Sequence, residues 1–434
     1  MIWILLLISF ATVGIVIYML KKSMYPMLKI AYLVYLLNFC IGHIILLSYR
    51  LIFEPESTVL LADTRLLEGN LNIEYLLFLN VLQLLFVCSG ILLTTSANSK
   101  RNELTAKSFP PELNTALVWA TSIGWIGNVA GVTGNVNLYS AFHPFELLGT
   151  AWIVSGFRLK PIRQVLVFFL ASLHLFWAVL IFHSKSEAFL ILVALLIRFL
   201  HSETSKKVSQ IMLVSISALF LFPFIQVQKG ILTLSKVQML LVSQGEKFSL
   251  PKSFAIGFLQ RFDGADSITD AYSAGAGSWY SFLDYSKLLI TKFIPNISFL
   301  LGNYFGEETS NSSSLGQLWN DQMRPFSMRN VTYGVPVTFG PMAEGFSIGG
   351  LSLGIFLCIL FGALIGFFCK SCYSIKLLPT LCGLYFMFHL ENLQNSFGNL
   401  ILMLSKVLQC YLLLKICYII VIPIKKKIDK IELV

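Results

Sequence analysis

Three aspartates follow an arginine in the second half of the chain at a spacing that could serve catalysis. In the stretch Gln260-Arg-Phe-Asp-Gly-Ala-Asp-Ser-Ile-Thr-Asp270, the carboxylates of Asp263, Asp266 and Asp270 would share one face of a helix beside Arg261. Carboxylates held together repel one another unless a cation, a set of substrate hydroxyls or a role as general base relieves the repulsion. A solvated acidic face has the same pattern, so both interpretations stay open.

Aromatic side chains follow in a segment rich in Gly and Ser, and they recur later in the same polar region. Flat aromatic faces flanked by a few polar groups suit sugar rings, as they suit small-molecule ligands in general. The aromatic residues that we expect to bind sugar are Trp279, Tyr280, Trp319 and Tyr333.

Basic residues in this region and in one short turn indicate an anionic ligand. Arg261, Arg324 and Arg329 belong to a segment that is predicted below to lie outside the cell membrane, where cations are normally depleted. A guanidinium group binds phosphate through two parallel hydrogen bonds, although each arginine could equally be a structural salt-bridge partner. Lys185, in the turn His183-Ser-Lys-Ser-Glu187, could bind phosphate or extend to lipid headgroups.

The elements that must position these residues are membrane helices. Of the 434 residues, 56% are hydrophobic and only 12% are charged, whereas soluble proteins have about 25% charged residues. The formal net charge of +10 would suggest nucleic acid in a soluble chain, but basic cytoplasmic loops explain it in a membrane protein. We therefore expect membrane lipids and no nucleic acid as partners.

About eleven runs are apolar enough to span a bilayer, which takes about 20 residues per helix. The fold class that we predict is an all-α, polytopic membrane bundle with one large extracytoplasmic loop. The expected spans are residues 2–20, 27–53, 75–97, 115–139, 142–157, 162–182, 187–200, 208–228, 346–369, 375–395 and 400–424.

Basic residues orient these spans, because Lys and Arg gather in cytoplasmic loops. They follow every second span, as with Lys100 after the third and Lys425 after the last. The alternation predicts a multi-pass protein with its N-terminus outside and its C-terminus in the cytoplasm. It divides the chain into residues 1–228 with about eight helices, the outer loop 229–344, and residues 345–434 with about three helices.

Further polar residues lie at or near the predicted spans. The outer loop opens with the basic amphipathic stretch Lys229–Lys252, which suits a helix on the membrane surface or one packed on the bundle. His389 ends the tenth span on the outer side, where ionisable residues mark functional paths or a hydrated helix end. Asn80 and Gln83 are interpreted as residues that bind neighbouring helices together.

Several functional classes lack their sequence patterns. The chain has no G-x-x-x-x-G-K-[ST] nucleotide loop and no H-E-x-x-H motif. Cys369 and Cys372 form a C-x-x-C without a second pair or a nearby His that would complete a zinc site. We expect neither a metal nor a cofactor.

The chain resembles the Wzy-type oligosaccharide repeat-unit polymerases, the O-antigen and polysaccharide polymerase family. The predicted spans and the single long outer loop extend the likeness over nearly the whole chain. The family usually has Arg where Lys185 stands, and in Ile294-Pro-Asn a basic residue is replaced by Asn296. The three stretches that support the likeness are His183-Ser-Lys-Ser-Glu-Ala-Phe-Leu-Ile-Leu, Arg261-Phe-Asp and Gly340-Pro-Met-Ala-Glu-Gly-Phe-Ser-Ile-Gly-Gly.

The resemblance implies a GT-C-like architecture and a metal-independent glycosyltransferase of the bacterial cytoplasmic membrane. Such an enzyme joins polyprenyl-diphosphate-linked oligosaccharides on the outer side, and a chain-length regulator and a flippase of the same pathway are its expected partners. Cations would stabilise the leaving diphosphate, and a carboxylate or imidazole would act as general base on the acceptor hydroxyl. The implied diphosphate ligands are Lys185, Arg261, Arg324 and Arg329, and the implied bases are Asp263 or Asp266, followed by Glu344 and His389.

Two other functions stay open. An O-antigen-ligase-like transferase would use the same donor with a different acceptor. A polysaccharide flippase or other transporter would be expected to show internal repeats and charge at the bilayer midplane. In this sequence the charge gathers at the outer ends of the spans, and no repeat is evident.

Overall fold

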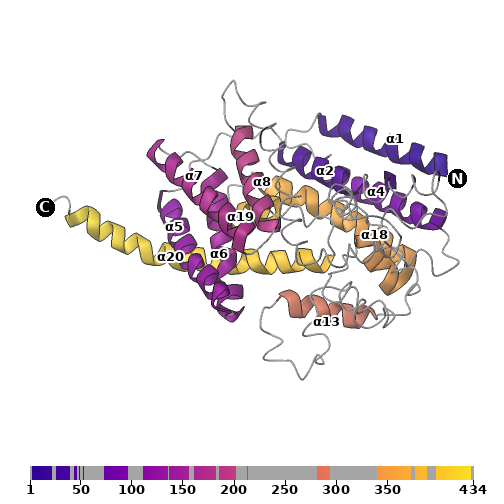
Figure 1. The fold of residues 1–434 in the computed structure, drawn as a ribbon. Helices are drawn as coiled ribbons and strands as arrows, with labels where there is room; N and C mark the ends of the chain where they lie inside the picture. The colour runs from indigo at the N-terminus through magenta and orange to yellow at the C-terminus, as the bar shows by residue number, and fades with distance from the viewer. Residues whose placement is uncertain are drawn as a thin grey trace, which may run out of the picture. The chain divides into compact units, whose positions relative to one another are not determined.

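The computed structural model describes most of the predicted helices and little of the outer loop. In the described residues the chain is almost entirely helical and contains no strand (Figure 1). The all-α prediction is therefore confirmed for this part of the chain. The described residues are 2–21, 26–39, 44–45, 48, 52, 73–95, 111–134, 136–155, 161–181, 185–201, 213, 281–293, 340–372, 377–388 and 397–431.

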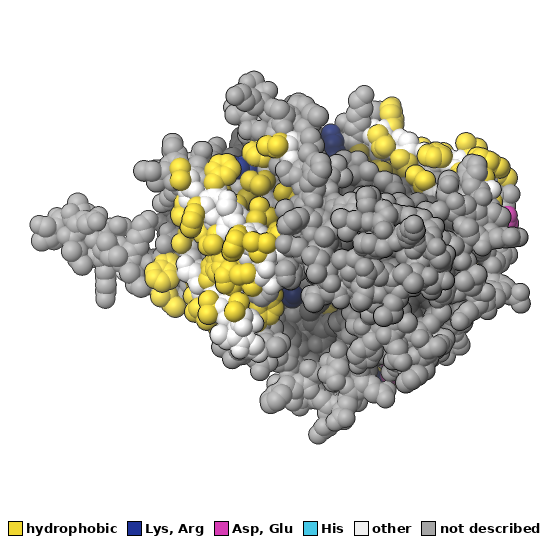
Figure 2. Space-filling model, in the orientation of Figure 1, with side chains coloured by type: hydrophobic (Ala, Val, Ile, Leu, Met, Phe, Trp, Pro, Cys, Tyr) yellow, Lys and Arg dark blue, Asp and Glu magenta, His cyan; other side chains and the backbone are white. Residues whose placement is uncertain are grey.

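Within these ranges, four helices are long and apolar enough to cross a membrane. Large apolar side chains such as Trp3, Trp119 and Phe169 are exposed on these four helices and on others. Figure 2 shows hydrophobic side chains gathered over much of the described surface on the face in view. Exposed apolar surface on this scale marks contact with something other than water, as expected of a membrane protein. The count of about eleven spans stays a prediction. The four helices are α1 (Ile2–Lys21), α4 (Ile73–Thr95), α18 (Pro341–Ser371) and α20 (Phe397–Ile431).

Proline starts four of the described helices, at Pro26, Pro111, Pro161 and Pro341. Its ring presets the φ angle of a helix, and its missing N–H would have no partner in the first turn. The other helices are α2 (Pro26–Phe39), α5 (Pro111–Val132), α6 (Val136–Ser155), α7 (Pro161–Phe176) with the π-helical η3 (Trp177–Ile181), α8 (Lys185–His201), α13 (Phe282–Phe293) and α19 (Leu377–Phe388).

The chain packs as two compact units, each built from segments that are far apart in sequence. The division at residues 228 and 344 follows the expected membrane topology, and it stays a prediction. The first unit comprises Met1–Lys100, Ser235–Ser374 and Leu390–Ser405, and the second comprises Arg101–Leu234, Ile375–His389 and Lys406–Val434.

In the first unit, α4 and α18 pack in parallel through glycines. A methyl group on Gly362 would overlap the backbone of Val87, and one on Gly366 would overlap the side chain of Thr94. Small residues allow helix backbones to approach closely, which gives membrane helices more van der Waals contact. The two helices have the same direction, as the charge pattern requires of the spans 75–97 and 346–369.

The helix α18 is broken near its start. Gly349 and Gly350 leave the helical conformation, and Gly350 has φ 76°. The segment before the break lies along the segment after it, since a methyl group on Gly345 would overlap the backbone of Gly354. The long apolar run therefore consists of a short buried helix followed by a longer one.

In the second unit, α5 and α6 form an antiparallel pair whose connection differs from the prediction. The predicted boundary between the spans 115–139 and 142–157 is wrong, because α5 ends at Val132 and α6 begins at Val136. The chain reverses through Gly134, whose φ of 80° favours glycine. The reversal contains the turn signal Thr133-Gly-Asn135 within a largely apolar stretch, and a boundary drawn from averaged hydropathy came too late because it did not use that signal.

The helices α6 and α8 run parallel in constant register. His143 contacts Glu187, and the guanidinium of Arg198 reaches the carbonyl of Val154. Both pairs are 44 positions apart, and the eleven residues between them correspond to about 16 Å of helix. The connections between α5 and α6 and between α7 and α8 therefore lie at the same end of these helices.

Candidate functional site

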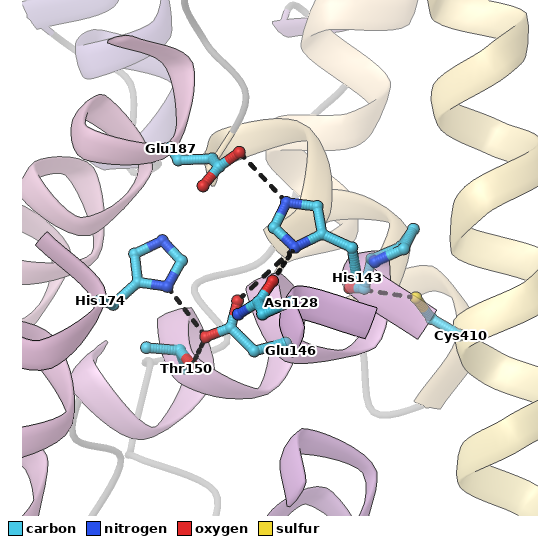
Figure 3. Close-up of polar contacts among 8 residues, drawn as sticks. Asn128, His143, Glu146, Thr150, His174, Glu187 and Cys410 are labelled. Atoms are coloured by element: carbon cyan, nitrogen blue, oxygen red, sulfur yellow. Dashed lines mark hydrogen bonds and ion pairs between the residues drawn. The ribbon is translucent and has the colours of Figure 1, made fainter. Parts of the chain in front are cut away.

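Four helices of the second unit bring ionisable and polar side chains together inside the protein. The cluster consists of Asn128 on α5, His143 and Glu146 on α6, His174 on α7 and Glu187 on α8 (Figure 3). Asn128, Glu146 and His174 are 0% exposed, and His143 and Glu187 are 7% exposed. Burying charged groups is costly unless they are paired, so such a cluster in apolar helices indicates function.

The outer part of the cluster is a histidine held between an amide and a carboxylate. His143 Nδ1 lies 2.6 Å from Asn128 Oδ1, and its Nε2 lies 3.1 Å from Glu187 Oε1. Because the amide oxygen can only accept, Nδ1 carries a proton in this arrangement. The contact between Nε2 and Glu187 then requires one more proton, located on either partner. One proton therefore lies in the hydrogen bond between His143 and Glu187.

The deeper part of the cluster is a second carboxylate–histidine pair. Glu146 Oε1 accepts hydrogen bonds from His174 Nδ1 at 2.8 Å and from the Thr150 hydroxyl at 2.6 Å. A carboxylate that binds one imidazole nitrogen fixes the ring orientation and tautomer, as in the dyads of hydrolases. In the described part of the chain, neither Glu146 Oε2 nor His174 Nε2 has a hydrogen-bond partner.

The two parts of the cluster are adjacent. Glu146 Oε2 lies 4.0 Å from His143 Nδ1, so the carboxylate faces both imidazoles. The ring of Tyr139 stacks on His143 with ring centroids 4.5 Å apart. From α20, the Cys410 thiol donates to the carbonyl of Pro144 at 3.8 Å, between the two ionisable residues of α6.

Both helices that supply the deeper pair are irregular beside it. Pro144 lies inside α6 between His143 and Glu146, and because it has no N–H, the helix lacks the backbone hydrogen bond that residue 144 would donate to the preceding turn. On α7 the α-helix gives way to a π-helical turn at Trp177, three residues after His174. Such turns are rare and frequent at functional sites, which supports a functional interpretation of the cluster.

No family model, curated protein or solved structure matches the chain. Function therefore rests on the residues and their geometry. Among the described residues, no group of three or more His, Cys, Asp or Glu has the arrangement of a metal site, and the contacts within the cluster are those of hydrogen-bonded acids and bases.

Of the predicted site residues, Glu344 is the one whose side chain the structure describes. It is fully buried at the start of α18, and its Oε2 accepts the backbone N–H of Phe397, the first residue of α20. Burial raises the pKa of the nearby Tyr285 phenol well above its ordinary value, and the Glu344 carboxylate raises it further. Gln83 accepts the N–H of Met342 at 3.3 Å, which confirms its predicted role between helices.

The side chains of the other predicted site residues lie outside the described part of the chain. Lys185 is the first residue of α8, and its side chain lies outside the described residues. The carboxylates, arginines, aromatic residues and histidine assigned to catalysis, diphosphate and sugar also lie outside them: Arg261, Asp263, Asp266, Trp279, Tyr280, Trp319, Arg324, Arg329, Tyr333 and His389.

Sequence reasoning passed over Asn128 and three ionisable members of the cluster, namely His143, Glu146 and His174. A signal was present for these three, because each is an ionisable residue inside a predicted apolar span. What the sequence could not reveal is that the three converge, since their separation along the chain gives no contact without the register of α5 to α8.

Proposed function

We propose that the protein is a membrane glycosyltransferase that joins polyprenyl-diphosphate-linked oligosaccharide repeat units on the outer side of the bacterial cytoplasmic membrane. The main support is the contact between Glu187 and the buried His143. Glu187 ends the turn that resembles the polymerase family, and Lys185 in the same turn matches the family's basic residue. A candidate base and a candidate diphosphate ligand thus belong to one short segment.

The proposed reaction needs both functions at once. The acceptor hydroxyl loses its proton to a base while its oxygen bonds to the anomeric carbon of the donor sugar. The bond from that carbon to the lipid diphosphate breaks, and the diphosphate leaves with the electron pair. His143 and Glu187 join Asp263, Asp266, Glu344 and His389 as candidates for the base. Lys185, with the three loop arginines, would stabilise the diphosphate.

The helix directions support an outer location for the cluster. The turn before Glu187 and the turn at Gly134 lie at the same end of their helices. Arg158 and Arg163 follow the other end of α6, and basic residues at that end favour a cytoplasmic location for it. The cluster then lies within reach of the outer surface, where lipid-linked glycans are polymerised.

A proton-coupled transporter is the second candidate function. Ionisable residues buried among membrane helices, such as Glu146 and His174, are typical of proton paths in pumps and transporters. This candidate predicts proton movement across the membrane without formation of a glycosidic bond.

Polymerisation by the purified protein tests the proposal. Wild-type protein in lipid, supplied with a defined polyprenyl-diphosphate repeat unit, is expected to form a ladder of longer glycans. His143→Gln and Glu187→Gln should leave single repeat units. Glu74→Gln, on the half-buried first turn of α4, is the matched control and should polymerise normally. Ladders of wild-type length from both cluster variants would remove the cluster from the mechanism. Proton flux without glycan product would favour the transporter.

A further inference from the structure

The deeper pair of the cluster, Glu146 and His174, can bind one further proton. His174 Nδ1 and the Thr150 hydroxyl both donate to Glu146 Oε1, so a further proton has to bind elsewhere on the pair. In the part of the chain that the structure describes, neither Glu146 Oε2 nor His174 Nε2 has a hydrogen-bond partner, and Glu146 Oε2 is the atom of the two that faces His143. Glu146 and His174 are both 0% exposed. A buried polar atom of this kind needs an explanation, and a transient proton supplies one.

Glu146 Oε2 faces the outer pair, which consists of His143 and Glu187. Glu146 Oε2 lies 4.0 Å from His143 Nδ1, about 1 Å beyond hydrogen-bond length. His143 in turn contacts Glu187 through its other ring nitrogen at 3.1 Å. One bridging water or a small rotation of the imidazole would complete a path from Glu187 to Glu146.

We infer that Glu146 and His174 hold the proton that leaves the acceptor hydroxyl, after it has passed through Glu187 and His143. The inference rests on the proposed glycosyl transfer. The O–H bond breaks, the proton binds first to the outer pair, and it then moves to Glu146 Oε2. The diphosphate leaves with the electron pair, and no oxidant or reductant takes part. After product release the proton returns to water by the same path.

Charge in the buried site explains why the proton moves inward. An ionised Glu146 beside a neutral His174 has a net charge of −1, and one added proton makes the pair neutral. Removing a net charge from an apolar interior is strongly favourable. A neutral deeper pair also leaves the outer pair ready to accept the proton of the next acceptor hydroxyl.

Other groups face the deeper pair from the helices packed around it. Helix α6 presents His143 and Tyr139. Helix α8 presents Glu187, and α20 presents the Cys410 thiol near Pro144. The groups whose charge acts on Glu146 within the described chain are His174 and His143. The pair has its net charge of −1 only while His174 is neutral, and in that state the His143 imidazole is the cation that can stabilise an ionised Glu146.

Infrared spectroscopy of the purified protein in lipid nanodiscs tests proton binding without any glycan. A carboxylic-acid band should grow as the pH falls, and it should be lost in Glu146→Gln, whose amide still accepts from His174 and Thr150. Retention of the whole band in Glu146→Gln would overturn the inference. Because this readout needs no polymerisation, it tests proton binding by the deeper pair separately from the proposed function.

The pH profile of polymerisation separates a proton-holding role from a structural one. Glu146→Gln should slow polymerisation by about 10²-fold and move the acid limb to lower pH, because removal of the negative charge weakens proton binding at the outer pair. Thr150→Val keeps the carboxylate of Glu146 but removes the hydroxyl that donates to it. Glu146 should then bind a proton more readily, so the acid limb of the pH profile should move to higher pH. Rates reduced equally at every pH in both variants would indicate packing alone and would contradict the inference.

Discussion

Gly127 on α5 and His143 on α6 are packed backbone against backbone, and a methyl group on Gly127 would overlap the main chain of α6 at this point. Gly124, one turn earlier, meets the backbone of Glu146 in the same way. Two glycines therefore determine how close the two ionisable residues of α6 come to α5. The contact between His143 and Asn128 depends on this approach.

A larger side chain at Gly127 should lower both the stability of the protein and its polymerisation activity. We expect Gly127→Ala to lower the stability of the protein by about 1–3 kcal/mol through overpacking and to reduce polymerisation. Thermal unfolding in detergent measures the first effect. Gly14→Ala is the matched control, because Gly14 has open space around it and alanine favours a helix. Equal melting temperatures for the two variants would contradict the close packing.

Glu344 offers a test between a helix cap and a general base. Since its carboxylate accepts the N–H of Phe397, Glu344→Gln keeps an acceptor and should keep most of the polymerisation activity. Glu344→Ala leaves that partly buried donor without its partner and should cost about 1–3 kcal/mol of stability. A stable but inactive Glu344→Gln would instead support the general-base role that the resemblance implies.

The break in α18 should tolerate only glycine at its second position. Gly350 has φ 76° and ψ −164°, a conformation that costs other residues about 1–3 kcal/mol. Gly350→Ala should therefore melt at a lower temperature than Gly349→Ala. The methyl group of the latter would meet mainly the flexible side chain of Leu353. The reverse order of melting temperatures would argue against the broken helix.

The orientation of the outer loop can be measured directly. A reporter enzyme that is active only after export, fused after Ser310, should be active, because residues 229–344 are predicted to lie outside. The same reporter fused after Lys425 should be inactive. Activity of the Lys425 fusion combined with silence of the Ser310 fusion would invert the topology and place the cluster at the cytoplasmic face.

The first turn of α13 should unfold locally more often in acid. Ser281 and Asp284 exchange hydrogen bonds there, and Lys287 contacts the same carboxylate. The Ser281 hydroxyl, followed by Lys287, lowers the pKa of Asp284. A carboxylate with a lowered pKa contributes stability above its ordinary value, and this is lost as the pH falls through the lowered pKa. Amide hydrogen exchange in α13 should accelerate below pH ~4, and Asp284→Asn should abolish the acceleration.

The sequence was sufficient for the helical fold class but not for the cluster. Apolar runs predicted the spans 115–139 and 162–182, and the structure starts the corresponding helices at Pro111 and Pro161. The break at Gly134 was missed because hydropathy does not register a backbone conformation. The contacts of Glu146 and His174 depend on helix register, which follows from glycine packing between helices, and single-residue properties do not encode it.

The antiparallel register of α5 and α6 links two short patterns into one recognisable spacing. Gly124-x-x-Gly127 lies against His143-x-x-Glu146 in reverse order, and the fifteen residues between Gly127 and His143 are fixed by the reversal at Gly134. An insertion in that reversal would shift both acid–base residues off their glycines. The signature G-x2-G-x15-H-x2-E could therefore identify distant homologues in genomes whose remaining sequence has diverged.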